Sequence, residues 1–290
     1  NNQSNLEKIN IDNNKMNRIT EIDGCGSTFF LGKPDAQPLN VALEKATELK
    51  HKLLIAYDYF EEGMKRPTKV YGSYKNVRKF YKHTKDIESD QRCFYVIVPE
   101  NTKCCLYADL EWSLDWKSVE EIKNKFIEVV TSTLNIAGVE VMSDDFLFAN
   151  ACDEKTNKGS LHAHIPCIYF KDVVEQQRFF NKVKLQIDET SEWSFIDESD
   201  KSYILKTFID FGVYNKNRQI RLPYSSKMKN DGIGVRPLIP EDEINFEMYQ
   251  WVITDLEDCD ANIGCIDVSK FPSEIVCKKL MEQRLGSKDS

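Results

Sequence analysis

Two carboxylates stand two residues apart inside an apolar run, the sequence CCLYADLEW at 104–112. Side chains alternate along an extended strand, so Asp109 and Glu111 would share one face and the larger apolar residues the other. Like charges on a half-buried face are unfavourable unless a cation lies between them, and a divalent metal is the commonest such partner. The Asp-x-Glu triplet also occurs at 86–88 and 255–257, so only its apolar setting distinguishes the copy at Asp109.

A second group of reactive side chains follows in KGSLHAHIPCIYF, residues 158–170. On a strand, Ser160, His162 and His164 would lie on one face, and Lys158 precedes them. Histidines in this setting can ligate a metal, transfer a proton or contact a phosphate, and simple cross-strand pairing is the structural alternative. The residues alone leave these choices open.

The His-x-His sequence also resembles the metal-binding motif of rolling-circle nicking enzymes, whose nucleophile is a tyrosine in a later Tyr-x-x-x-Lys motif. Tyr71 with Lys75 has this spacing but lies upstream of the histidines. After them, Tyr224 and Lys227 are one residue too close together. Nicking is therefore the second interpretation.

A third group sets one carboxylate against several cations. In FIDFGVYNKNRQIRLPYSSKMK, residues 208–229, Asp210 is the single acid and is followed by Lys216, Arg218, Arg221, Lys227 and Lys229. Phosphoryl transfer uses this combination, because carboxylates hold divalent metals while cations hold and neutralise a triphosphate. These residues favour phosphoryl transfer, and their order along the chain is specific: an acid pair, Ser-x-His, one Asp and then a basic cluster.

That order resembles the archaeo-eukaryotic primase superfamily, and most closely its primase-polymerase (PrimPol) branch of eukaryotes and large DNA viruses. The stretch VYNKNRQIRLPYSSK at 213–227 is similar to a Val-Tyr-x-x-Asn-Arg-x-x-Arg-Leu-x-x-Ser-Ser-Lys sequence in that branch. The resemblance covers residues 65–230 and implies a DNA primase-polymerase that starts and extends primers on single-stranded DNA, in replication or in damage tolerance such as translesion synthesis.

The resemblance also implies roles for individual residues. Asp109, Glu111 and Asp210 would be catalytic and would ligate Mg²⁺ or Mn²⁺ in a two-metal site. The nucleotide would be bound by a larger basic and polar set: Lys158, Ser160, His162, Arg218, Arg221, Lys227 and, more loosely, Lys75. His164 lies outside the pattern, and a supporting role is expected for it.

The periodicity of apolar residues predicts an α+β chain. Expected helices are 39–62, 118–134 with a cap at Ser118 and Glu121, 172–187, and two near 241–254 and 273–284; expected strands are 93–98, 104–112, 146–151, 160–170 and 218–224. The resemblance refines this to an RRM-like sheet module packed on a smaller α/β module, with the active site in the cleft between them. We expect a polar arm at 1–24, a catalytic core at 25–240 and an acidic, largely helical segment at 241–290, all within a longer protein.

Charge is distributed unevenly over a chain whose net charge is −8. Residues 65–85 carry eight Lys or Arg, no acid and four Tyr or Phe, which is typical of nucleic-acid binding. Residues 201–236 carry eight basic and two acidic residues, whereas 241–260 carry eight acids and no Lys or Arg. The acidic stretch is expected either to mask the basic regions or to dock a helicase or single-strand-binding protein.

Nine scattered cysteines without a Cys-x-x-Cys motif indicate reduced thiols, and hence a nucleus, mitochondrion, cytoplasm or viral replication site. A zinc site using Cys259 and Cys265 is disfavoured, because their spacing does not fit the common patterns. No apolar run is long enough to span a membrane. The primase-polymerase resemblance implies as partners a single-stranded DNA template, a primer strand and ribo- or deoxyribonucleoside triphosphates. A non-catalytic module that binds single-stranded nucleic acid is the competing interpretation.

Overall fold

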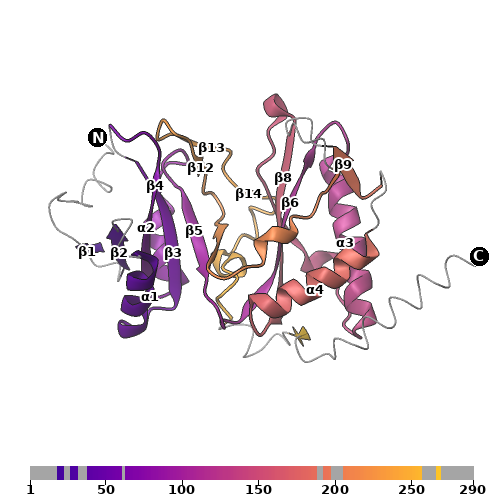
Figure 1. The fold of residues 1–290 in the computed structure, drawn as a ribbon, viewed down its shortest axis with the longest axis horizontal. Helices are drawn as coiled ribbons and strands as arrows, with labels where there is room; N and C mark the ends of the chain where they lie inside the picture. The colour runs from indigo at the N-terminus through magenta and orange to yellow at the C-terminus, as the bar shows by residue number, and fades with distance from the viewer. Residues whose placement is uncertain are drawn as a thin grey trace, which may run out of the picture. The chain divides into compact units, whose positions relative to one another are not determined.

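The chain folds into two compact units, each built around its own sheet (Figure 1). The computed structural model describes residues 18–22, 27–31, 38–60, 63–187, 192–196, 205–256 and 266–268. Unit 1 comprises residues 1–98, 219–238 and 247–255, and unit 2 comprises 99–218, 239–246 and 256–290. The α+β class expected from the sequence is confirmed.

Unit 1 contains a six-stranded sheet in the order β1-β2-β4-β3-β5-β11. Its strands are β1 (Arg18–Ile22), β2 (Ser27–Leu31), β3 (Leu53–Tyr59), β4 (Thr68–Tyr74), β5 (Phe94–Val98) and β11 (Arg218–Arg221). Two helices belong to this unit, α1 (Pro38–Glu48) and α2 (Val77–Thr84), together with the short strands β12 (Lys227–Met228) and β13 (Gly234–Val235). Phe80 of α2 packs edge-to-face on Phe94 of β5 and on Tyr74 of β4, which joins the helix to the core.

The helix expected over 39–62 is wrong in its second half. Helix α1 ends at Glu48, Lys50 adopts a left-handed conformation with φ 54°, and the chain enters strand β3 at Leu53. The run LLIAYDY is almost continuously buried in the sheet. A short apolar run of this kind fits a buried strand as well as a helix, so its spacing could not separate the two.

Unit 2 contains a second sheet in which β8 (Lys158–Phe170) is central. It pairs with β6 (Cys104–Ser113), with β7 (Leu147–Asn150) and with β15 (Ile266–Asp267), and β14 (Ile239–Pro240) pairs with β7. The hairpin β9 (Ser194–Ile196) and β10 (Leu205–Thr207) and the short turns η2 (Ser143–Asp145), η3 (Glu154–Thr156) and η4 (Phe211–Val213) complete the unit. Strands β5 and β6 follow each other in the sequence but belong to different sheets.

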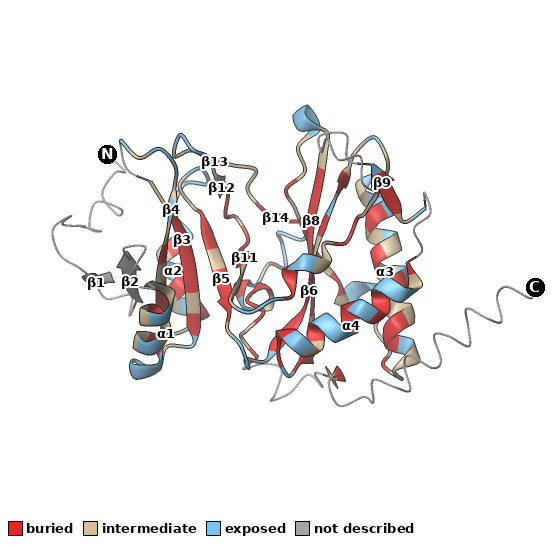
Figure 2. Ribbon diagram, in the orientation of Figure 1, coloured by how far each residue is buried: buried red, intermediate tan, exposed pale blue. Residues whose placement is uncertain are grey.

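Two helices of unit 2, α3 (Val119–Ile136) and α4 (Val173–Gln186), confirm the sequence expectation. Phe126 of α3 packs edge-to-face on Phe148 of β7, so this helix covers the apolar face of the sheet. Figure 2 shows the resulting pattern, with β6 and β8 mostly buried and an exposed outer surface on both helices. Among the described helices, none combines the length and the hydropathy of a membrane span.

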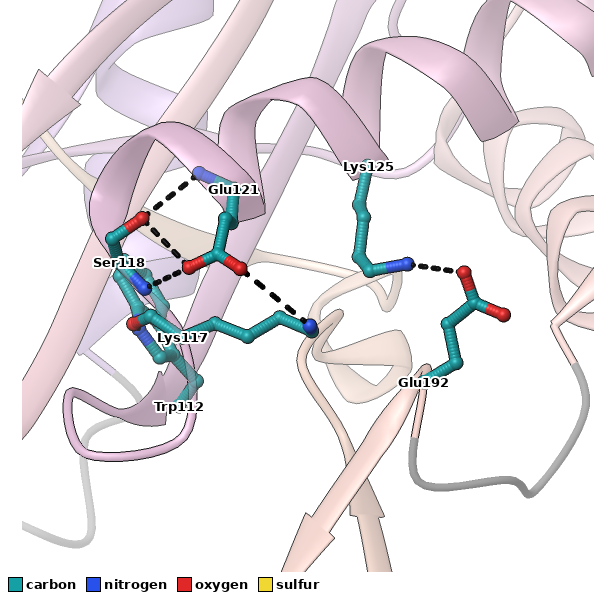
Figure 3. Close-up of polar contacts among 6 residues, drawn as sticks. All are labelled: Trp112, Lys117, Ser118, Glu121, Lys125 and Glu192. Carbon is teal, nitrogen blue, oxygen red and sulfur yellow. Dashed lines mark hydrogen bonds and ion pairs between the residues drawn. The ribbon is translucent and has the colours of Figure 1, made fainter.

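Helix α3 begins with a capping box (Figure 3). The Ser118 hydroxyl accepts from the Glu121 amide, and the Glu121 carboxylate accepts from the Ser118 amide. Just before this cap, the Trp112 indole N–H donates to the Lys117 carbonyl at 2.8 Å, which ties the end of β6 to the start of α3.

Removal of this cap gives a testable prediction. Ser118→Ala should lower the free energy of unfolding by about 1 kcal/mol, because the Glu121 amide loses its acceptor at the helix end. Ser118→Asp should retain most of the stability, since a carboxylate accepts the same bond. Urea denaturation of both variants measures the difference, and an equal loss in the two would contradict the capping role.

The segment after residue 240 differs from its expected helix. Within 241–254 the structure has only the 3-10 turn η5 (Met248–Trp251). Asp242 accepts from both the backbone and the side-chain amide of Asn245, and this local turn competes with helix formation.

Of the polar arm expected at 1–24, the structure describes only β1, which is paired with β2. The expected helix at 273–284 and the cysteines at 25, 259, 265 and 277 lie outside the described residues.

Candidate active site

The pairing of β6 with β8 brings the first two groups of candidate residues together. Asp109 lies opposite His162, Glu111 opposite Ser160, and Ser113 opposite Lys158 in an antiparallel register. Directly opposed residues of antiparallel strands present their side chains on the same face. The acid pair and the Ser-x-His pair therefore form one surface of unit 2.

The third group joins this surface at the edge of β6 that does not pair with β8, which is called here the free edge of β6. Leu110 and Ile209 form an isolated antiparallel bridge, and the Asp210 amide donates to the Asp109 carbonyl at 2.9 Å. The Glu111 amide donates in turn to the Phe208 carbonyl, also at 2.9 Å. This pairing places Asp210 beside Asp109, although the two are about a hundred residues apart in the chain.

The candidate side chains lie close to one another on this surface. Lys158 Nζ forms an ion pair with Glu111 Oε1 at 2.8 Å, whereas His162 Nε2 lies 3.8 Å from Asp109 Oδ1, which is too long for a hydrogen bond. Asp210 Oδ1 accepts from the Gly212 amide at 2.8 Å and so caps η4. The side chains of Lys158 and Glu111 are 36% and 47% exposed, so their ion pair is weak and can be exchanged for other partners.

Within the described residues, no group of three or more His, Cys, Asp or Glu side chains is arranged to hold a metal ion. The donor set nevertheless suits Mg²⁺ or Mn²⁺, because these ions take oxygen ligands and are usually held by one or two carboxylates together with substrate phosphates. Asp109, Glu111 and Asp210 supply such oxygens from neighbouring backbone positions.

A pair of buried tyrosines that the sequence did not indicate connects η4 to β6. The Tyr107 hydroxyl donates to the Val213 carbonyl at 2.9 Å, and the Tyr214 hydroxyl donates to the Tyr107 carbonyl at 3.0 Å. Burial raises the pKa of Tyr214 well above its usual value, and the charges of Asp109 and Asp210 act in the same direction. Both hydroxyls therefore stay protonated and hold the Asp210 segment against β6.

Gln176 of helix α4 satisfies another part of the free edge of β6. Its side-chain oxygen accepts from the Tyr107 amide at 3.2 Å, and its nitrogen donates to the Cys105 carbonyl at 2.9 Å. Gln176 is fully buried. The side chain therefore takes the place of a neighbouring strand next to the site.

The close approach of the Trp112 indole explains why the residue between Lys158 and Ser160 is a glycine. It lies opposite Trp112, and a Cβ atom at this position would come within 2.2 Å of the indole ring. Only glycine lets the strand pass beneath the buried Trp112 side chain. Packing of the indole therefore constrains the strand position between the two candidate phosphate-binding residues.

His164 is only 1% exposed and lies opposite Tyr107 in the β6–β8 register. Burial lowers its pKa to about 3, so the imidazole is neutral at physiological pH. These properties fit the supporting role expected for His164. The burial of His164 does not favour a His-x-His metal site, in which both rings would have to reach the ion.

The buried neutral imidazole predicts acid sensitivity. Its pKa is lower in the folded state than in the unfolded chain, so its contribution to stability is complete above about pH 6.5 and is lost as the pH falls towards 3. The loss is about 1.4 kcal/mol per pH unit for one proton. Urea denaturation between pH 4 and 6.5 measures how steeply the free energy of unfolding falls as the pH falls. His164→Gln should reduce this slope by the equivalent of about one proton, and by more than His51→Gln does. An unchanged slope would contradict the assignment.

The candidate basic residues are divided between the two units. Arg218 is the first residue of β11 and the last residue of this segment of unit 2. It lies close enough to Tyr107 to offset part of the burial-driven rise in the pKa of that tyrosine, and its Nε is buried with no hydrogen-bond partner in the described part of the chain. In unit 1, Arg221 is 9% exposed and donates to the Arg236 carbonyl. Lys227 and Lys75 are exposed residues of the same unit.

Comparison with known proteins adds one weak likeness. No protein-family model matches the chain. The chain is 30% identical over 138 residues to the uncharacterized protein ORF49 of Ostreid herpesvirus 1 (isolate France). The match covers 47% of this chain and 12% of the viral protein, so the chain corresponds to a small part of that relative.

Proposed function

We propose that the chain is a template-dependent nucleotidyltransferase of the primase-polymerase kind, which joins nucleotides on single-stranded DNA. The observation that carries this proposal is the assembly of three distant sequence motifs on β6, β8 and the segment after β10. Asp109 has His162 on one side and Asp210 on the other. This arrangement is consistent with the archaeo-eukaryotic primase resemblance of the sequence.

In this proposal, Asp109, Glu111 and Asp210 would hold Mg²⁺ or Mn²⁺ together with the phosphates of the incoming nucleotide. Such an ion, when bound, neutralises phosphate charge and lowers the pKa of the attacking 3′-hydroxyl. The fold fixes two of the three acids by placing them on a paired strand, and backbone bonds to that strand fix the third. Catalysis of this type depends mainly on the positions of charges.

The other residues of unit 2 would bind the triphosphate. Lys158 can leave Glu111 for a phosphate oxygen, because their ion pair is exposed to solvent. Ser160 and His162 are largely buried and lie opposite the two acids, so they can donate hydrogen bonds at a fixed position. Arg218 can use its buried guanidinium nitrogen in the same way.

Roles for Lys75, Arg221 and Lys227 of unit 1 as further nucleotide contacts stay predictions. So do the participation of the protein in replication or damage tolerance and the docking of a helicase or single-strand-binding protein on the acidic stretch 241–260. Neutralising the eight acids of this stretch should weaken the capture of such partners in a pull-down. Unchanged capture would exclude a docking role for the stretch.

The proposed function is tested by synthesis without a primer. Unprimed single-stranded DNA, Mg²⁺ or Mn²⁺ and labelled ribo- or deoxyribonucleotides are incubated with the protein, and products are resolved on a denaturing gel. We expect extended labelled products, and the preferred label identifies the sugar preference. Cleavage of the DNA with no incorporation would favour the nicking alternative instead. Tight DNA binding with neither reaction, even on a primed template, would favour the non-catalytic binding module.

A further inference from the structure

Helix α2 of unit 1 presents four cations on one side. Lys75 precedes the helix, and Arg78, Lys79 and Lys82 follow at spacings of three and four residues, which place them on a common face. Lys75, Arg78 and Lys82 are exposed, and Lys79 is partly exposed. We call these four residues the α2 basic face.

The cations of the α2 basic face lack ion-pair partners among the described residues. None of the four makes an ion pair with a carboxylate in the part of the chain that the structure describes, and residues 65–85 contain no acid. The next cation, Lys85, does have a neighbour, because its Nζ lies 4.0 Å from Asp86. In a chain of net charge −8, a concentrated set of unpaired cations indicates a surface for a polyanion.

An aromatic side chain lies at the edge of the α2 basic face. Tyr81 is 38% exposed and follows Arg78 by three residues, so the two are neighbours on the helix surface. Tyr249 of η5, also 38% exposed, belongs to a turn that packs against α2. Exposed rings with surrounding cations are typical of surfaces on which the bases of single strands stack while the phosphates meet positive charge.

Helix α2 does not have the properties of a membrane-binding helix. Its apolar side chains Val77 and Phe80 are buried in the core of unit 1, and Phe80 packs between Tyr74 and Phe94. A helix that lies on a membrane must instead expose its apolar face to lipid. The charged face with its exposed ring therefore fits a nucleic acid better than a lipid surface.

We infer that the α2 basic face, together with Tyr81, is a binding surface for single-stranded nucleic acid. The choice of nucleic acid over another polyanion rests on the proposed function, whereas the surface itself is independent of the carboxylate site. Two of the four aromatic residues in the basic stretch 65–85, Tyr74 and Phe80, belong to the core. The surface therefore depends on Tyr81 and the cations rather than on the whole stretch.

The inference is tested by fluorescence anisotropy with a labelled oligothymidylate about 20 nucleotides long, without nucleotide or divalent metal, at several salt concentrations. The charge variant is Arg78→Ala with Lys82→Ala. Its matched control is Lys171→Ala with Arg178→Ala, which removes two exposed cations from unit 2. We expect binding by the charge variant to weaken about tenfold relative to the control, and its salt slope to fall by about 1.4.

A second pair of variants tests the ring. Tyr81→Ala should weaken binding at least about fivefold, whereas Tyr81→Phe should bind as the wild type does, because stacking needs the ring and not the hydroxyl. Far-UV circular dichroism establishes that each variant is folded. Equal binding by the charge variant and its control would overturn the inference. Competition by polyglutamate as effective as that by unlabelled DNA would also overturn it, in favour of an acidic protein partner.

Failure of this inference can be separated from failure of the proposed function. A variant with Asp109→Asn and Glu111→Gln should bind the oligonucleotide as the wild type does, because it leaves the α2 basic face intact. If this variant also lost binding, the surface would not be independent of the carboxylate site. That result would overturn the inference.

Discussion

Replacing Asp109 with asparagine and Glu111 with glutamine should lower nucleotide incorporation by at least about 10³-fold, because both substitutions remove negative charge where the proposed function requires a metal–triphosphate complex to be held. The new side chains have nearly the same size as the old ones. The Lys158 ion pair is exposed, and its loss should change stability little. Primer extension under single-turnover conditions measures the effect on chemistry, and thermal denaturation measures the stability.

A matched control uses two exposed carboxylates of unit 2 outside the site. Glu140→Gln with Asp144→Asn removes the same amount of charge and should leave incorporation within about twofold of the wild type, as surface substitutions usually do. If the Asp109 and Glu111 variant retained a tenth or more of the wild-type rate, the carboxylate pair would not be the catalytic centre.

The second large effect is expected at Gln176. Gln176→Met keeps the volume and the apolar character of the site but removes the partners of the Tyr107 amide and the Cys105 carbonyl. Each buried backbone group left unsatisfied costs about 1–3 kcal/mol, so we expect the free energy of unfolding to fall by about 2–5 kcal/mol. Urea denaturation measures this loss.

The neighbouring residue provides the control for Gln176. Gln177 is exposed on the same helix, and Gln177→Met should change stability by less than about 0.5 kcal/mol. Gln176→Glu should also lose stability at neutral pH, because an ionised carboxylate cannot donate to the Cys105 carbonyl and its charge would be buried. If Gln176→Met were as stable as the wild type, the side chain would not be required at the edge of β6.

The strands and helices that carry the site were predictable from local sequence. The alternation in CCLYADLEW and KGSLHAHIPCIYF indicated β6 and β8, and the Ser118 cap indicated the start of α3. The sequence could not reveal the register of β6 against β8, because both strands are buried on both faces over most of their length and the apolar pattern therefore does not select one register. The structure provides this register and hence the opposition of Asp109 and His162.

Contacts between distant segments were harder to predict. Nothing in the sequence near Gln176 or Tyr214 shows that they contact β6, because each interaction joins residues about 70 to 107 positions apart. The error over 39–62 has a related cause, since the burial that favours strand β3 comes from neighbouring strands rather than from the segment itself. Tertiary context decided both cases.

In the proposed function, Asp109, Glu111 and Asp210 form one site for a metal–nucleotide complex, and the linked binding of metal and nucleotide tests this arrangement directly. Mn²⁺ is titrated into the wild type and into Asp210→Asn by electron paramagnetic resonance, with and without a non-hydrolysable deoxynucleoside triphosphate, after correction for Mn²⁺ bound by the free nucleotide. The proposed site predicts that the nucleotide raises the Mn²⁺ affinity of the wild type at least about tenfold and that Asp210→Asn loses this coupling. Equal coupling in both proteins, or none in the wild type, would contradict it.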